Sequence, residues 1–363
     1  MKTMDRPLLL ITVILAVVGF FIFTSASLGL LAREGPRFSS IAFNQIFFGM
    51  ILGTAALLLT SKIRFRMWKM YAPYIFGLSI LATLLVFIPG LGLELHGAKR
   101  WVEVFKFSFQ PAEILKLGFV IYLAAYLAGA RQRLHEYRHG LIPFALILGV
   151  PSLILLLQPD TGTVLVIASA ATAMYIVAGG KIRDLLILFV IAVLALGALV
   201  YQRPYLRDRV ESYISPEKHL QESGYQLNQS LIAIGSGGIF GRGFGQSIQK
   251  FNYLPEPIGD SIFAVAAEEF GFLGALVLIF LFLAFCFRGL KIASRAPDYF
   301  SGLLVVGIVI LIVSQSFINI GSMLGVFPLT GLPLLFISHG GTALLFALAS
   351  VGIVLNISKY QKH

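Results

Sequence analysis

Charge and cysteine are both scarce in this chain. Only 12% of its 363 residues are charged, whereas 58% are hydrophobic, and the mean hydropathy is +0.88. A soluble globular chain carries about 25% charged residues, so this composition excludes a soluble domain. The single cysteine, Cys286, excludes an intrachain disulfide. We therefore expect helix packing in lipid, without covalent cross-links, to hold the fold.

Long apolar runs fill the chain instead. A helix that crosses a hydrocarbon core about 30 Å thick needs roughly 20 apolar residues. Strands of a membrane barrel would alternate in polarity, which the run 276–280 (LVLIF) does not. We predict one all-α polytopic integral membrane domain over residues 1–363, with a long outward loop, 202–261, between the seventh and eighth spans. About ten transmembrane helices are expected, near 7–25, 40–60, 73–91, 110–128, 140–158, 161–179, 185–201, 262–286, 301–320 and 338–358. The first is too long for a signal peptide and is expected to stay uncleaved.

Basic residues outnumber acidic ones by 28 to 17, which would suit a nucleic-acid partner. Their positions favour another explanation. If the N-terminus is cytoplasmic, more than half of the basic residues fall in cytoplasmic segments, with only four acidic residues among them. This positive-inside pattern predicts that both termini are cytoplasmic and that no nucleic acid is bound. The basic residues concerned are Lys2, Arg6, Lys62, Arg64, Arg66, Lys69, Arg131, Arg133, Arg138, Lys181, Arg183, Arg288, Lys291, Arg295, Lys359 and Lys362.

The glycine-rich stretch 235–245 (GSGGIFGRGFG) superficially resembles a phosphate-binding loop. Its register does not give G-x-G-x-x-G, and no Gly-Lys-Ser/Thr follows it. We expect these glycines to allow a tight re-entrant or interfacial turn against other helices.

Ionisable residues are costly at membrane depth, so each one is a candidate for function. Pro111 suits the first position of the fourth span, and Glu113 lies in its first turn, where the helix dipole favours an anion. Lys116 is three residues further on and shares a face with Glu113. Two interpretations remain open: an ion pair that fastens the helix, or a cation that lines a polar cavity for a phosphate-bearing ligand.

Three further carboxylates lie near span ends. Asp160 is predicted to be the N-cap of the sixth span, with a role in the cavity as the alternative. Glu268 and Glu269 are adjacent, so we expect them to point to different faces, not to share one partner, and one of them to hold a neighbouring helix by a buried hydrogen bond.

Asp260 lies at the outer mouth of the eighth span. A carboxylate at this place could act as a general base on an alcohol, or hold a divalent cation. It could equally be an N-cap, and the residues alone leave these alternatives open.

The chain resembles the SEDS family (shape, elongation, division and sporulation) of FtsW and RodA proteins. The resemblance runs in family order from about residue 99 to the end. Its blocks are 99–101 (KRW), 107–113 (FSFQPAE) with Lys116, 158–163 (QPDTGT), 224–226 (GYQ), 234–238 (IGSGG), 254–256 (LPE), Asp260 with 262–265 (IFAV), 267–269 (AEE), 319–321 (NIG), 331–334 (GLPL) and 338–341 (SHGG). Gln249-Lys250 and the run 253–256 (YLPE) look more like FtsW than RodA.

The resemblance implies a multi-pass protein of the bacterial cytoplasmic (inner) membrane that polymerises peptidoglycan from lipid II on its outer face. It implies that Asp260 is the catalytic base, and that Arg100 and Lys116 stabilise the departing diphosphate. A shared divalent cation, Mg or Mn, could assist at Asp260, and no organic cofactor is expected. The implied partners are membrane lipids, a class B penicillin-binding protein and other division or elongation proteins. The implied substrate site adds Trp101, Glu113, Asp160, Gln226, Glu256 and Ser338.

Two places depart from the family pattern. Ile258-Gly259 and Ser261 replace family residues around Asp260, and His339 replaces a tyrosine, so it could titrate where tyrosine would not.

A flippase of the lipid-linked precursor is the alternative function. The ionisable residues favour the enzyme because they cluster near the outer face. A degenerate scaffold is a third possibility, and retention of Asp260, Glu113 and Lys116 argues against it.

Overall fold

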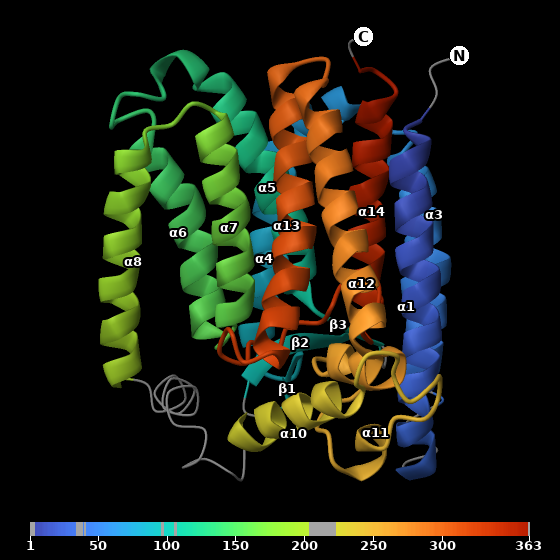
Figure 1. Ribbon diagram of the computed structural model, residues 1–363. Coiled ribbons are helices and arrows are strands. Elements are labelled where there is room, and N and C mark those ends of the chain that lie inside the picture. The colour runs from blue at the N-terminus through green and yellow to red at the C-terminus, as the bar shows by residue number, and fades with distance from the viewer. Residues whose placement is uncertain are drawn as a thin grey trace.

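The computed structural model describes residues 4–33, 39, 41–95, 98–104, 107–202 and 223–361. Its long helices run side by side as one bundle, with a small sheet and two short horizontal segments at one end (Figure 1). We call this end the sheet end and the other the terminal end. The chain is mostly helical, as predicted.

Within the described residues, seven helical segments are long and apolar enough to cross a membrane: Arg6–Leu31, Ile41–Thr60, Phe65–Phe87, Pro111–Gly129, Ile262–Ser294, Tyr299–Met323 and Gly341–Ser358. Leu141–Leu157 and Thr161–Val177 are apolar but shorter, and Ile182–Gln202 is apolar over 21 residues. The predicted count of ten spans therefore stays a prediction. The elements are α1 (Arg6–Arg33), η1 (Asn44–Leu52), α3 (Gly53–Thr60), α4 (Phe65–Leu84), η2 (Leu85–Phe87), β1 (Gly92–Leu95), β2 (Ala98–Val104), β3 (Phe107–Phe109), α5 (Pro111–Gly129), η3 (Arg131–Arg133), α6 (Leu141–Leu157), α7 (Thr161–Val177), α8 (Ile182–Gln202), α10 (Ser223–Ser236), α11 (Gln249–Asn252), α12 (Ile262–Ser294), α13 (Tyr299–Met323) and α14 (Gly341–Ser358).

The helices differ in what surrounds them. α13 and α14 are the most buried of the seven candidate spans, and α8 at the edge of the bundle is exposed along most of its length. Polar side chains inside the apolar helices find partners across the bundle. Thr60 of α3 donates to the carbonyl of Ala349 at 2.8 Å, and Asn356 of α14 donates to that of Ser61 at 2.8 Å. These hydrogen bonds supply partners for polar groups, which lipid cannot do.

The prediction for the third span was wrong at its start. α4 begins at Phe65, not at residue 73. Arg66 and Lys69 lie in the first two turns and lower the hydropathy there, while Pro73 sits inside the helix. Long basic side chains can reach the membrane surface from such positions.

Residues 92–95, 98–104 and 107–109 form a three-stranded antiparallel sheet in the order β1-β2-β3, a small non-helical part that the predicted all-α fold did not include. Val102, at the centre of β2, pairs with Gly92 on one side and Phe109 on the other. Figure 1 places this sheet at one end of the bundle.

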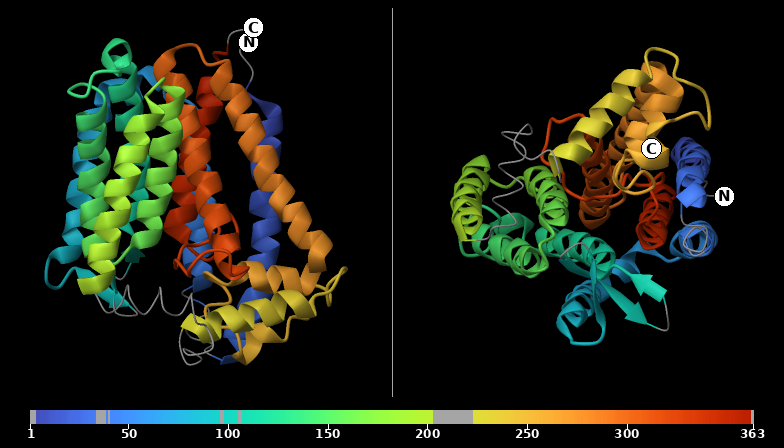
Figure 2. Two further views of the ribbon diagram at one scale, coloured as in Figure 1. Left: turned by 60° about the vertical axis from the view of Figure 1, so that its left-hand side comes forward. Right: turned by 90° about the horizontal axis from the view of Figure 1, so that it is seen from below.

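The predicted span 262–286 is interrupted, which is the second correction. Gly271 has φ +68° and ψ −167° inside α12, a conformation that favours glycine. A Cβ at Gly271 would lie 2.3 Å from the amide nitrogen of Gly241. The break divides α12 into a first half, residues 262–270, and a second half, residues 272–294; Figure 2 shows the first half turned away from the second.

The glycine-rich turn 237–245 packs against this break, as predicted for a tight turn against other helices. Helix breaks free backbone groups that need partners in a membrane. Here the turn supplies them: its N–H groups donate to the carbonyls of the first half, and its carbonyls accept from the N–H groups of the second. The pairs are Arg242 N to Glu268 O (3.0 Å), Gly243 N to Glu269 O (2.9 Å), Phe272 N to Gly238 O (2.9 Å) and Leu273 N to Ile239 O (3.2 Å).

The start of α1 and the end of α14 meet at the terminal end. The Asp5 amide donates to the Ser358 hydroxyl at 3.0 Å. Arg288, in the second half of α12, pairs with the Asp5 carboxylate at 2.7 Å. The start of α1 and the end of α14 therefore lie on one side of the bundle, whichever side of a membrane that is.

Candidate active site

Asp260 precedes the first half of α12 and is held through its backbone. Asn319 of α13 donates its Nδ2 to the carbonyl of Asp260 at 2.8 Å and to that of Leu332 at 2.7 Å. Gln226 of α10 donates to the hydroxyl of Ser261 at 3.0 Å. Two helices that are distant in sequence thus fix the start of α12.

The segment after α13 holds the other side of the Asp260 turn. The Ser338 hydroxyl donates to the carbonyl of Gly259 at 2.7 Å and accepts from the amide of Leu334 at 2.8 Å. The His339 amide donates to the carbonyl of Ile258 at 2.7 Å. The backbone of the turn is therefore bonded on both flanks, and Asp260 itself is only partly buried.

Arg100 of β2 approaches the same place from the sheet. Its guanidinium donates to the carbonyl of Gln158 at 3.3 Å and also to that of Pro159. A Cβ built on Gly331 would lie 3.5 Å from Asp260 Oδ2 and 3.7 Å from Arg100 Nη1. A cation and a carboxylate thus border one small space, and Gly331, with φ +70°, leaves it open.

Asp260 is not the N-cap of α12, which removes one of the two interpretations of this residue. The N-cap position is Ser261, and no side-chain bond caps it within the described part of the chain.

Asp160 is the N-cap of α7, as predicted. Its carboxylate accepts from the Thr163 amide at 3.2 Å and from the Thr163 hydroxyl at 2.8 Å. The side chain is almost fully buried, and Gln110 lies at 3.5 Å. These contacts give Asp160 a structural role. It follows Gln158 and Pro159, whose carbonyls accept from Arg100.

Glu113 and Lys116 form a buried ion pair in α5. Lys116 Nζ lies 2.8 Å from Glu113 Oε1 and 2.6 Å from Gln315 Oε1 of α13. Gln315 in turn donates to the carbonyl of Pro333 at 3.1 Å. The cavity beside this pair has room for about one water molecule. The pair therefore fastens α5 to α13 and to the segment that carries Gly331, and a direct contact of Lys116 with substrate stays a prediction.

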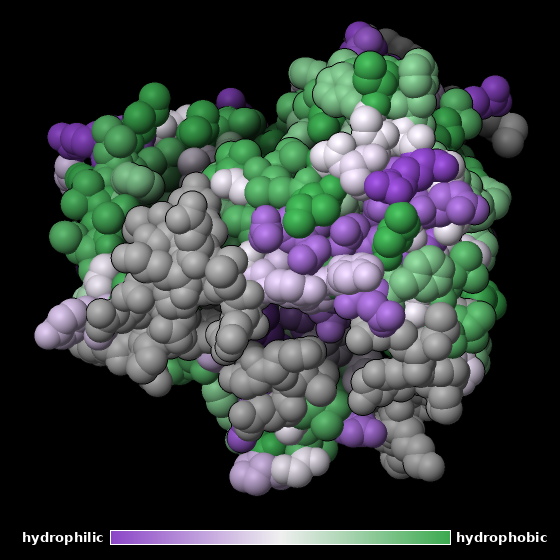
Figure 3. Space-filling model, turned by 60° about the horizontal axis from the view of Figure 1, so that its bottom comes forward, coloured by the Kyte–Doolittle hydropathy of each residue, from purple (hydrophilic) through white to green (hydrophobic). Residues whose placement is uncertain are grey.

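The remaining predicted site residues lie around the Asp260 turn or on the sheet. The exposed Glu256 closes the turn, because its carbonyl accepts from the amides of Gly259 and Ser261 at 3.1 and 3.2 Å. Trp101 follows Arg100 in β2 and pairs with Leu93. Figure 3 shows polar side chains gathered at the middle of the sheet end, where the surface is hollowed.

A divalent cation at Asp260 stays a prediction. No group of three or more His, Cys, Asp or Glu side chains that could hold an ion is present among the residues described. Mg²⁺ is usually bound by one or two carboxylates together with substrate phosphates. Asp260 fits such a shared site and not a cation cage made by the protein alone.

His339 is partly buried and stacks against Phe23 of α1. Burial lowers its pKa from 6.5 to about 4, because a charged imidazolium is disfavoured away from water. It is therefore neutral near pH 7, and it titrates only in acid. This refines the expectation that His339 adds a titrating group.

The predictions for Glu268 and Glu269 hold in part. Glu269 accepts from the Ser25 hydroxyl of α1 at 2.6 Å, so one carboxylate does bind a neighbouring helix. The two nevertheless share a partner: Ser247 donates its hydroxyl to Glu268 at 2.5 Å and its amide to Glu269 at 3.4 Å. Sequence reasoning missed the role of Lys250 here and that of Gln315, although a polar residue within an apolar helix is itself a signal.

Comparison with known proteins places the chain in a family. The cell cycle protein family of FtsW, RodA and SpoVE matches residues 6–363. Stage V sporulation protein E of Bacillus subtilis is 36% identical over 359 residues, covering 99% of this chain and 98% of that protein. The probable peptidoglycan glycosyltransferase FtsW of Idiomarina loihiensis is 37% identical over 362 residues, covering 99% and 88%.

Solved structures agree with this. A chain from a peptidoglycan synthase complex, described as coordinating polymerization and crosslinking, superposes with a TM-score of 0.81 at 28% identity and covers 99% of both chains. The rod shape determining protein RodA of Thermus thermophilus superposes with a TM-score of 0.71 at 26% identity, covering 99% of this chain and 98% of that one. This protein therefore belongs to the FtsW, RodA and SpoVE family of cell cycle proteins.

Proposed function

We propose that this chain is a peptidoglycan glycosyltransferase that polymerises glycan strands from lipid II at the membrane surface. The observation that carries the proposal is the placement of Asp260 and Arg100 beside the same glycine, Gly331. Glycosyl transfer from a diphosphate needs a base near the acceptor and positive charge near the leaving group. The relatives named as probable peptidoglycan glycosyltransferases support this chemistry.

In the proposed reaction, Asp260 takes the proton from the acceptor sugar 4-hydroxyl. The hydroxyl oxygen forms a bond to the anomeric carbon of the donor, and the bond from that carbon to the diphosphate oxygen breaks. The diphosphate leaves with the electron pair, still attached to its polyprenyl chain. Arg100 stabilises the negative charge that develops on it, because its guanidinium can bond two phosphate oxygens at once. A divalent cation bound by Asp260 and the diphosphate would share that charge.

The buried pair of Glu113 and Lys116 supports the site from below. Lys116 holds Gln315, and Gln315 holds the carbonyl of Pro333 in the segment that carries Gly331. A contact between Lys116 and the diphosphate would require this pair to open. Trp101, Gln226, Glu256 and Ser338 complete the proposed substrate site at the sheet end.

The orientation follows from where the charges lie. The connections of the terminal end carry most of the basic clusters: 62–69, 131–138, 181–183 and 288–295. We propose that this end is cytoplasmic and that the sheet end faces outward. Single cysteines in place of the exposed Gln246 and Arg133, on a Cys286→Ser background, test this. An impermeant reagent added outside should label only the cysteine at position 246; labelling at 133 alone would reverse the orientation.

The likeness to a chain from a peptidoglycan synthase complex suggests a crosslinking partner. We propose a class B penicillin-binding protein in this role, within the division machinery.

The function itself is tested with purified protein in lipid and a labelled lipid-linked disaccharide. Glycan polymer is expected from the wild-type chain alone. Movement of the intact precursor across the bilayer without polymer would favour the flippase instead.

A further inference from the structure

Lys250 and Glu269 form a buried ion pair that the proposed chemistry does not use. Their Nζ and Oε1 atoms are 2.7 Å apart, and their side chains are 0% and 1% exposed. Burying two charges is costly, and well-packed apolar residues would often be as stable. An ion pair in this place therefore suggests a requirement for exact geometry beyond stability.

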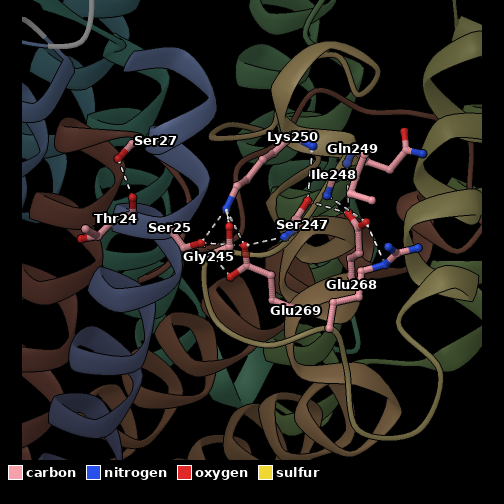
Figure 4. Close-up of polar contacts among 11 residues, drawn as sticks. Thr24, Ser25, Ser27, Gly245, Ser247, Ile248, Gln249, Lys250, Glu268 and Glu269 are labelled. Atoms are coloured by element: carbon pink, nitrogen blue, oxygen red, sulfur yellow. Dashed lines mark hydrogen bonds and ion pairs between the residues drawn. The ribbon is translucent and has the colours of Figure 1, made fainter. Parts of the chain in front are cut away.

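The pair and its bonds join three segments: α1, residues 245–250 and the first half of α12 (Figure 4). Lys250 donates to Glu269, to the Ser25 hydroxyl of α1 at 3.0 Å and to the carbonyl of Gly245 at 2.9 Å. Glu269 accepts in addition from Ser25 at 2.6 Å and from the Ser247 amide at 3.4 Å. We call Ser25, Lys250 and Glu269 the clamp.

Glu268 adds a second set of bonds at the same end of the half-helix. Its carboxylate accepts from the Ser247 hydroxyl at 2.5 Å and from the amides of Ile248 and Gln249 at 3.1 and 3.3 Å. Arg242 lies 3.4 Å away. Through Glu268 and the clamp, the C-terminal end of the first half of α12 is bonded to both α1 and the 242–250 segment.

The first half of α12 needs such bonds because the helix does not hold it. The helical geometry is interrupted at Gly271, so the second half of α12 does not set the direction of the first half. Residues 261–269 are all buried, so we treat the half-helix as one packed rod. Asp260 lies at one end of this rod and Glu269 at the other, about 13 Å apart at 1.5 Å per residue. A tilt at the Glu269 end would displace Asp260.

We propose that the clamp positions Asp260 for catalysis. Ser25, Lys250 and Glu269 are positioning residues: they touch neither substrate nor reacting atoms, and they set the tilt of the half-helix that carries the base. This inference rests on the proposed glycosyl transfer. Misplacing a catalytic group by about 1 Å can lower turnover about a hundredfold.

A second ion pair in the molecule provides a matched control. Asp5 and Arg288 are also 2.7 Å apart and tie the start of α1 to the second half of α12 at the terminal end. This pair connects the same two helices on the far side of the Gly271 break. Removing it should affect stability without affecting the position of Asp260.

The test compares Glu269→Gln, Lys250→Met and the double variant with the control Asp5→Asn/Arg288→Met. Thermal unfolding, KM and kcat per folded protein are measured for each purified protein. We expect a decrease in kcat of at least about tenfold for all three clamp variants, with KM within about twofold of wild type. The single variants leave a buried charge unpaired and should also unfold earlier.

The double variant separates positioning from stability. It leaves no unpaired charge, so its unfolding temperature should recover toward that of the wild type while kcat stays low. Ser25→Ala keeps both charges and should fold normally with about a threefold lower kcat. The control should lose stability and keep kcat within twofold.

Wild-type kcat per folded protein in both the double variant and Ser25→Ala would overturn the inference. So would an equal loss of kcat in the control. Asp260→Asn in the same assay separates this failure from failure of the proposed function. If the wild type polymerises, Asp260→Asn does not, and the clamp variants equal the wild type, only the positioning role fails. If the wild type makes no polymer, the proposed function fails and the clamp's role fails with it.

Discussion

The two halves of α12 have similar apolar sequences but different surroundings. Residues 261–269 are all buried, and residues 260–269 have polar partners from α1, α10 and α13. The second half buries one stripe, formed by Leu278, Phe282, Phe285, Gly289 and Ile292, and exposes Val277, Phe280 and Phe287 by 58% or more. The first half carries the candidate base, and the second half is a lipid-facing span. Hydropathy measures apolar content and does not distinguish a helix packed in protein from a helix packed in lipid.

The largest effect should come from removing the break between the halves. Gly271→Ala puts a Cβ 2.3 Å from the amide nitrogen of Gly241, at a φ of +68°. Backbone atoms cannot yield as a side chain can, so we expect a loss of about 3 kcal/mol or more in unfolding free energy. The measurement is denaturant unfolding in detergent. Polymerisation per total protein should fall with it.

Gly77→Ala in α4 is the matched control, because nothing lies within 4 Å of its Cβ position. An alanine there should be neutral or stabilise α4 by up to about 1 kcal/mol. Equal behaviour of the two variants would show that the break at Gly271 is not required.

A smaller effect is expected from Glu268→Gln in the first half. The amide keeps one acceptor oxygen, so some of the donors from Ser247, Ile248 and Gln249 lose their partner. Each unsatisfied buried group costs about 1–3 kcal/mol. Thermal unfolding of purified Glu268→Gln should therefore begin at a lower temperature.

Phe280→Leu in the second half is the control. Phe280 is 58% exposed, so this change should alter stability by no more than about 0.5 kcal/mol. If Phe280→Leu costs as much as Glu268→Gln, the two halves do not differ as described.

The last effect concerns pH and is absent near neutral pH. Burial holds the pKa of His339 at about 4 in the folded protein, below its ordinary value of 6.5, so the unfolded chain binds more protons between these values. Stability from neutral His339 is complete above about pH 6.5 and is lost as the pH falls toward 4. His339→Tyr should remove this part of the acid sensitivity, seen as a flatter plot of unfolding temperature against pH. An unchanged plot would mean that His339 does not contribute.

Much of the helical frame is predictable from apolar runs of about 20 residues. In lipid the backbone N–H and C=O groups must hydrogen-bond to each other, which an α-helix achieves within one segment. The N-cap role of Asp160 and the position of Pro111 follow from local rules. The start of α4 was missed because Arg66 and Lys69 lower its hydropathy. The break at Gly271 was missed because many glycines in membrane helices are ordinary packing positions, and only the approach of Gly241 distinguishes this one.

The site was predictable in its residue types and less so in its contacts. Family resemblance pointed to Asp260 and Arg100, and the structure brings both beside Gly331. The bonds of Asn319 to Asp260 and of Lys250 to Ser25 join residues 59 and 225 positions apart. The periodicity of a single sequence does not predict contacts between residues so far apart along the chain. The sheet that carries Arg100 was likewise missed because its strands are short.

Asp260→Asn tests the central claim most directly. Asparagine matches aspartate in size, and Ser261 is the N-cap of α12, so the fold should be kept. As a base, Asp260 would contribute at least about a hundredfold to turnover. We therefore predict that purified Asp260→Asn unfolds within about 1 kcal/mol of the wild type, still binds the lipid-linked disaccharide, and makes almost no glycan polymer. Wild-type rates of polymer formation by the folded variant would contradict the account.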